Sequence, residues 1–85
     1  MDLKDTISGM TSEDYKERFI AEYCQAVIRA RKLKNIIDDY ETGDLKFTLS
    51  CPIELLKQQY EYMTAYVGCL VKRMKYEGIE NLPSL

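Results

Sequence analysis

An unbroken seam of apolar side chains runs through the first half of the chain at alternating spacings of four and three residues. Neither proline nor glycine interrupts the seam, and this spacing is typical of a helix that packs along a second helix. The seam consists of Phe19, Tyr23, Ala26, Ala30, Leu33, Ile37 and Tyr40. The pattern predicts one helix over residues 12–41, which Gly43 ends by adopting the left-handed conformation.

The start of this helix carries a capping signal. Thr11 is expected as the N-cap residue, with Asp14 three positions later completing a capping box. Acidic residues in the first turn suit the positive end of the helix dipole. Residues 1–11 show no such periodicity, and we expect them to form a mobile lead-in with room for a short helical turn.

A second seam with the same spacing follows Pro52, which suits the first position of a helix because its missing N–H has no partner there. This seam consists of Leu56, Tyr60, Met63, Val67, Leu70 and Met74. It predicts a helix over 52–77, ended at Gly78. The short connection between the helices, an extended loop at 44–51, favours an antiparallel arrangement. We therefore expect an all-α fold, with a helical hairpin domain over 12–79 and a tail over 80–85.

Composition and charge limit the possible functions. A chain of 85 residues forms one small domain, and its longest apolar stretch, 66–71, is too short to span a bilayer. The formal net charge of −2 does not favour attraction to DNA. Three cysteines without framework spacing indicate free thiols in a reducing compartment, so a cytoplasmic location is expected.

Catalysis finds little support in the sequence. There is no histidine, which excludes histidine acid–base chemistry and Cys–His zinc sites and leaves the cysteines without a histidine base. Asp38 and Asp39 are adjacent, and neighbours on a helix point about 100° apart. There is no glycine-rich phosphate loop. We expect a protein that is not an enzyme, with no catalytic residues, no metal site and no cofactor.

Both helices carry more apolar surface than one seam uses. On the first helix, the additional residues are Ile20, Cys24, Val27, Ile28 and Ile36. On the second helix, a separate polar-aromatic stripe consists of Leu55, Gln59, Tyr62, Tyr66, Cys69, Arg73 and Tyr76. One hairpin cannot bury both stripes, so we predict a homo-oligomeric bundle with Tyr62, Tyr66 and Tyr76 in the interface. The alternative is a loosely packed monomer whose tyrosines lie on its surface.

Basic side chains gather in two places. An antiparallel hairpin brings Tyr15 and Arg18 close to Lys72 and Arg73 at one end. In the middle of the first helix, Arg29 and Lys32 are i, i+3 neighbours that can grip one phosphate. The alternative is a solvated face whose cations pair with Glu22, Glu61 or another protomer. The candidate ligand-binding residues are Tyr15, Arg18, Arg29, Lys32, Lys72 and Arg73.

Several short motifs together suggest a family. The sequence resembles small phage and prophage proteins of Gram-positive gut bacteria, which in turn resemble the anti-CBASS sponge family. The resemblance covers residues 12–79. The motifs that carry it are Tyr15-Lys16-Glu17-Arg18-Phe19, Glu22-Tyr23, Ile28-Arg29, Lys32-Leu33, Leu45-x-Phe47-Thr48, Cys51-Pro52-x-Glu54-Leu55-Leu56, Met63-x-x-Tyr66, Leu70, Arg73 and Glu77-Gly78-Ile79.

The resemblance implies a homo-oligomer, expected to be a hexamer, that binds cyclic oligonucleotide messengers in pockets between protomers. Such proteins sequester the signal without cleaving it, so the antiviral effector of the host is not activated. An aromatic residue and a lysine or arginine clamp the base and phosphates there. By resemblance Tyr15 stacks the base, Arg29 or Lys32 contacts phosphate, and Lys72 or Arg73 supplies the second cation.

One feature of the sponge family, a glycine after its phosphate-binding lysine, has no counterpart in this chain. The implied ligand is a cyclic dinucleotide, a cyclic trinucleotide or a molecule of the cyclic ADP-ribose type. The implied setting is the cytoplasm of an infected or lysogenic bacterium. An alternative function is a phage inhibitor that acts by direct protein–protein contact, as anti-CRISPR proteins do, and a third is a purely structural coiled-coil component.

Overall fold

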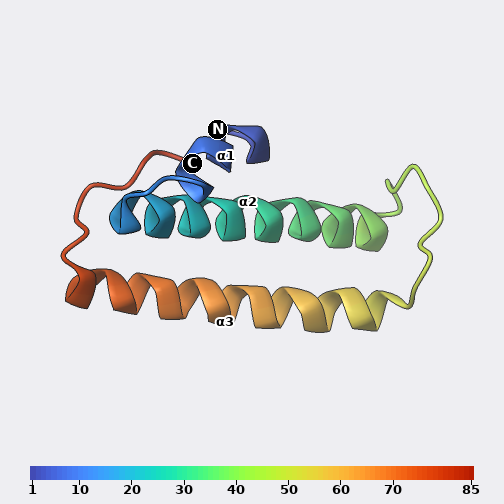
Figure 1. Ribbon diagram of the computed structural model, residues 1–85. Helices are drawn as coiled ribbons and strands as arrows, with labels where there is room; N and C mark the ends of the chain where they lie inside the picture. Colours follow the sequence, from blue (N-terminus) through green and yellow to red (C-terminus); the bar gives the residue numbers. More distant parts are fainter.

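The computed structural model describes residues 1–85 and contains helices but no strands, which confirms the all-α prediction. A 3-10 helix η1 (Leu3–Thr6) leads directly into a short helix α1 (Ile7–Met10). Two long helices follow, α2 (Tyr15–Thr42) and α3 (Ile53–Glu77). Figure 1 shows α2 and α3 side by side with the chain running in opposite directions, joined by an irregular connection.

Helix α2 begins later than the capping signal predicted. Its N-cap residue is Asp14, whose carboxylate accepts a hydrogen bond from the backbone N–H of Lys16 at 2.9 Å. Thr11 instead directs its hydroxyl back to the carbonyl of Ile7 at 3.0 Å, so the prediction of Thr11 as the N-cap was wrong. A hydroxyl one turn from a preceding carbonyl can bond to that carbonyl rather than cap the next helix, and Thr11 does so here.

Both long helices end as the sequence predicted. Gly43 and Gly78 adopt positive φ angles of 80° and 69°, and their N–H groups bond to carbonyls of the last helical turn. A residue with a Cβ is strained in this conformation, and glycine is not. Pro52 lies one position earlier than expected, as the N-cap residue of α3 rather than its first helical residue.

The core of the α2–α3 pair lies toward one end of an elongated molecule that measures 42 × 24 × 20 Å. Four buried side chains form it: Phe19 and Ala26 from α2, Leu70 and Met74 from α3. Half-buried Val67 packs against this cluster from α3. Helix α3 is otherwise thinly covered, because Leu70 and Met74 are its only buried residues.

The N-terminal segment packs against a second face of α2. Gly9 of α1 lies so close to Ala21 that a Cβ at residue 9 would stand 2.8 Å from the Ala21 Cβ. Cys24 is buried on the same face, and Ile28, one turn further along, is buried too. Interpreting Cys24 and Ile28 as surplus apolar surface was therefore wrong, since η1 and α1 form a small third layer over α2.

Candidate functional site

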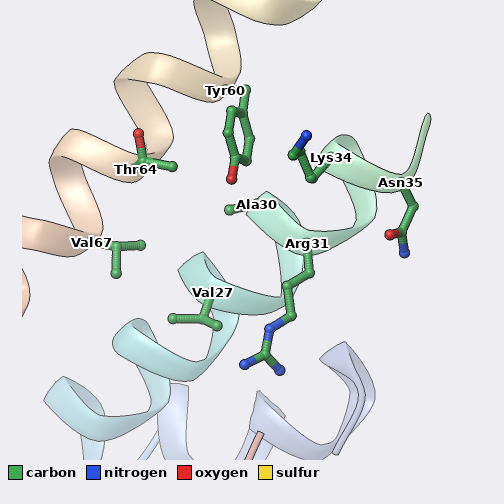
Figure 2. A pocket seen from close by; sticks show the side chains of 8 residues that line it. All are labelled: Val27, Ala30, Arg31, Lys34, Asn35, Tyr60, Thr64 and Val67. Carbon is green, nitrogen blue, oxygen red and sulfur yellow. The ribbon is translucent and has the colours of Figure 1, made fainter. Parts of the chain in front are cut away.

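A groove of about 360 Å³ runs between α2 and α3 near the middle of the hairpin. Figure 2 shows its lining side chains, which come from both helices. Half-buried Val27 and Val67 and buried Ala30 form its apolar floor. The remaining lining residues are polar or charged and consist of Arg31, Lys34, Asn35, Tyr60 and Thr64. This combination of an apolar floor with a few convergent polar groups is typical of small-molecule sites.

The groove exists because the two seams do not match in size there. Helix α2 presents Ala30, which has a single methyl group, at the position where α3 presents the large ring of Tyr60. A methyl group does not fill the space beside a phenol ring, so Tyr60 stays half-buried instead of entering a closed core. Its ring consequently forms one wall of the groove, available for stacking.

The two cations of the groove differ in their partners. Arg31 makes no hydrogen bond or ion pair within the chain, so its guanidinium is open to an anionic ligand. Lys34 Nζ lies 2.6 Å from Asp38 Oδ1, one turn along α2. The hydrogen bond to Asp38 is the main cause that raises the pKa of Lys34 above its ordinary value. Lys34 therefore stays charged at neutral pH, and a phosphate would compete with Asp38 for it.

Two of the residues predicted from the sequence, Tyr15 and Arg73, do come together, at the end where α2 starts and α3 finishes. Arg73 donates a hydrogen bond to the Tyr15 hydroxyl at 2.9 Å, and its guanidinium lies 4.8 Å from the Phe19 ring centroid. Arg73 also pairs with Glu77 at 3.3 Å. Hydrogen bonding to Glu77 raises the pKa of Tyr15, and hydrogen bonding to Tyr15 lowers the pKa of Glu77. These contacts join the two helices and use the donors that a ligand would need.

The other predicted cations are spread over the surface. Lys32 pairs with Asp2 of the N-terminal segment at 2.9 Å, whereas Arg29 lines a different groove, so the two do not form one phosphate grip here. Arg18 donates to the backbone carbonyl of Ser12 at 2.7 Å. Lys72 is exposed and has no ion-pair partner in the chain.

The α2–α3 groove was not identified from the sequence, although its residues were visible there. Arg31 and Lys34 lie in the middle of α2 beside Arg29 and Lys32, and Tyr60 belongs to the second seam. The signal that points to the groove is the pairing of a small seam residue, Ala30, with a large amphipathic one, Tyr60. Using that signal requires the register between the helices, which a single sequence does not specify.

The structure contains neither a membrane-spanning helix nor a cluster of metal-ligating side chains. None of the helices combines the length and the apolar composition of a bilayer-spanning segment. Nowhere do three histidine, cysteine, aspartate or glutamate side chains gather as metal ligands would.

Comparison with known proteins places the chain in a family. The family model of Sequestin matches residues 13–76, which include all of α2 and nearly all of α3. No curated protein and no solved structure matches the chain. The name of the family denotes sequestering, which agrees with the resemblance to sponge proteins and with a binding function. Because the match extends over both long helices, the chain belongs to the Sequestin family.

Proposed function

We propose that this protein binds and sequesters a cyclic nucleotide immune messenger of a bacterial host on behalf of a phage, without cleaving it. The observation that carries the proposal is the α2–α3 groove, where an unpaired arginine, a lysine and a half-exposed tyrosine surround an apolar floor. Stacking on an aromatic ring and pairing of phosphate with arginine are the two contacts that nucleotides need most. The family name supports sequestering as the outcome.

In this proposal each side chain of the groove has a distinct part. The Tyr60 ring stacks on a base, and Arg31 forms a bidentate pair with a phosphate. Lys34 leaves Asp38 to make the second phosphate contact. Asn35 and Thr64 offer hydrogen bonds that orient the ligand. The volume of about 360 Å³ equals about twelve water molecules at ~30 Å³ each, enough for one nucleotide unit rather than a whole cyclic ligand.

The chemistry of the groove favours binding over turnover. Its eight lining residues include no carboxylate, thiol or imidazole that could act as a general base near neutral pH. Two cations and a ring that recognise ground-state phosphate and base would hold the messenger without accelerating its hydrolysis. A protein of this kind lowers the free concentration of the messenger by mass action.

Self-assembly belongs to the same proposal. The outer face of α3 leaves Tyr62, Tyr66 and Tyr76 exposed, and Tyr76 is 92% exposed. Aromatic residues on a thinly covered helix suit an interface between copies, and a hexamer is the expected size. In such an assembly Arg29 and Lys72 would add to the ligand contacts from neighbouring protomers. Tyr15, Arg18, Lys32 and Arg73 would do so only by leaving the partners that they have within the chain.

The test is thermal unfolding of the purified protein with a panel of cyclic dinucleotides, cyclic trinucleotides and cyclic ADP-ribose isomers. A ligand at a hundred times its Kd adds about 2.7 kcal/mol to the stability of the native state. One or two members of the panel should raise the melting temperature clearly. Arg31→Ala should abolish that shift, because it removes the cation that has no partner within the chain.

Lys46→Ala provides the matched control, since Lys46 is an exposed cation in the connection between α2 and α3, outside the groove. That variant should respond to the ligand as the parent does. A panel without any shift, measured on a well-folded protein, would contradict the proposal. A shift lost in both variants would show nonspecific charge attraction instead of a site.

One observation favours a second candidate function, inhibition of a host protein by direct contact. The exposed tyrosines of α3 are the side chains that protein interfaces prefer, whether the partner is another copy or a different protein. This function predicts capture of one defined host protein, lost in a Tyr62→Ala, Tyr66→Ala double variant. It also predicts that no member of the nucleotide panel changes the melting temperature.

A further inference from the structure

A second groove, of about 210 Å³, lies across the seam from the first. Arg29 lines it and Arg31 lines the first, and residues two apart on a helix point about 200° away from one another. The same relation holds on α3, where Tyr66 lines the second groove and Thr64, two residues earlier, lines the first. The hairpin therefore carries one groove on each side, and the proposed function uses only one of them.

The second groove differs from the first in having a carboxylate. Glu22 lines it together with Gln25 and Arg29. The Tyr66 hydroxyl donates a hydrogen bond to Oε2 of Glu22, which holds the carboxylate in place. Oε1 of Glu22, the Gln25 amide and the Arg29 guanidinium make no hydrogen bonds within the chain. The groove thus presents a fixed acceptor, an amide and a free cation, whereas the charged side chains of the first groove are both cations.

The remaining lining residues are suited to a flat ring. Ala26 forms the floor, and Met63 and Tyr66 form an apolar wall on α3. A methionine thioether makes favourable contacts with aromatic rings. The volume corresponds to about seven water molecules at ~30 Å³ each, which is the scale of a nucleobase rather than of a nucleotide.

We propose that this second groove binds a nucleobase that carries an exocyclic amine, with Glu22 accepting from the amine and Arg29 pairing with the attached phosphate. Carboxylates accept hydrogen bonds from the exocyclic amine of cytosine, and glutamine pairs with that of adenine. Tyr66 acts as a positioning residue that orients Glu22. The groove stands on its own geometry, whereas the choice of a nucleotide as the ligand rests on the proposed function. Each chain would then hold two nucleotide units, one on each side.

Met63 makes the inference testable, because it is the only methionine that lines either groove. Protein labelled with ¹³C at the methionine and threonine methyl groups is titrated with AMP and followed by NMR. The Met63 signal should shift and saturate. Purine riboside 5′-monophosphate, which lacks only the amine, should bind this groove about tenfold more weakly, the effect of one hydrogen bond to a charged group. Adenosine should also bind more weakly than AMP.

Variants separate the contributions. Glu22→Ala should remove the preference for AMP over the analogue that lacks the amine, whereas Glu61→Ala, an exposed carboxylate outside this groove, should keep it. Arg29→Ala should remove the advantage of AMP over adenosine. Tyr66→Phe keeps the ring and should weaken the amine preference, because Glu22 loses its fixed orientation.

The outcomes distinguish this inference from the proposed function. The methyl group of Thr64 lines the first groove and reports on it independently. A Thr64 shift with no Met63 shift would overturn the second groove and leave the first intact. A saturating, amine-dependent Met63 shift that persists in Arg31→Ala would establish the second groove even if the first fails. Equal affinity for AMP and for the analogue without the amine would refute the role given to Glu22.

Discussion

Replacing Gly9 by alanine should release the N-terminal segment from α2. The new Cβ would stand 2.8 Å from the Ala21 Cβ, well inside the ~3.5–4.0 Å at which carbon atoms pack. Overpacking of this kind costs about 1–3 kcal/mol, which raises the population of the detached segment about five- to 150-fold. Detachment uncovers Cys24, which is 2% exposed in the packed state.

The assay measures the rate at which a thiol reagent labels Cys24, in a background where Cys51 and Cys69 are replaced by serine. Labelling should accelerate by the same factor if opening precedes reaction. Ser8→Ala is the matched control, because residue 8 is exposed on the same short helix. Unchanged labelling in Gly9→Ala would refute the packing of this segment on α2, and equal acceleration in both variants would refute the role of the Gly9 contact.

Three further predictions concern stability. Leu70→Ala should lower the free energy of unfolding by about 2–5 kcal/mol in urea denaturation, because Leu70 is 1% exposed in the four-residue core. Arg73→Ala should lower the melting temperature more than Lys72→Ala does, since Arg73 alone contacts side chains of α2. The hydrogen-bonded ion pair with Lys32 of α2 lowers the pKa of Asp2 below its ordinary value of 3.8. Asp2 therefore contributes stability above that pH and loses it as the pH falls through the lowered pKa. The urea midpoint of Asp2→Asn should consequently fall less than that of the parent protein when the pH is lowered through and below 3.8.

The two long helices could be predicted from sequence because their signals are local and agree with one another. The seam through Phe19, Ala26 and Leu33 has the helical period, and Gly43 and Gly78 mark the ends of the helices with the backbone freedom those positions need. The errors at the helix starts have a local cause as well. Thr11 and Asp14 are both good caps, and the hydroxyl of Thr11 is used by α1 instead.

The packing of the N-terminal segment could not be predicted in the same way. Ten residues are too few to show a period, and the contact depends on Gly9 allowing α1 to approach Ala21 closely. The apolar face of α2 at Cys24 was visible, but the sequence does not say what covers it. The cover is the first ten residues of the chain.

The candidate site, like the packing of the N-terminal segment, could be predicted from the sequence only in part. Residue types that bind nucleotides were recognised, but their grouping depends on register and on competing partners within the chain. Arg73 is engaged by Tyr15 and Glu77, and Lys32 by Asp2, so these cations serve the fold. Arg31 remains without a partner. Whether a cation has a partner within the chain depends on tertiary contacts. The spacing of residues along a helix does not predict those contacts.

The most direct test of the central claim is to measure the messenger itself. A cyclic nucleotide that stabilises the protein is incubated with an excess of the protein. The free nucleotide is then measured by mass spectrometry after ultrafiltration. The protein is then denatured by heat and the total nucleotide is measured again. Sequestration predicts that free nucleotide falls sharply with the parent protein but not with Arg31→Ala, and that denaturation returns all of it with unchanged mass. Undiminished free nucleotide, or recovery of a hydrolysed product, would contradict the account.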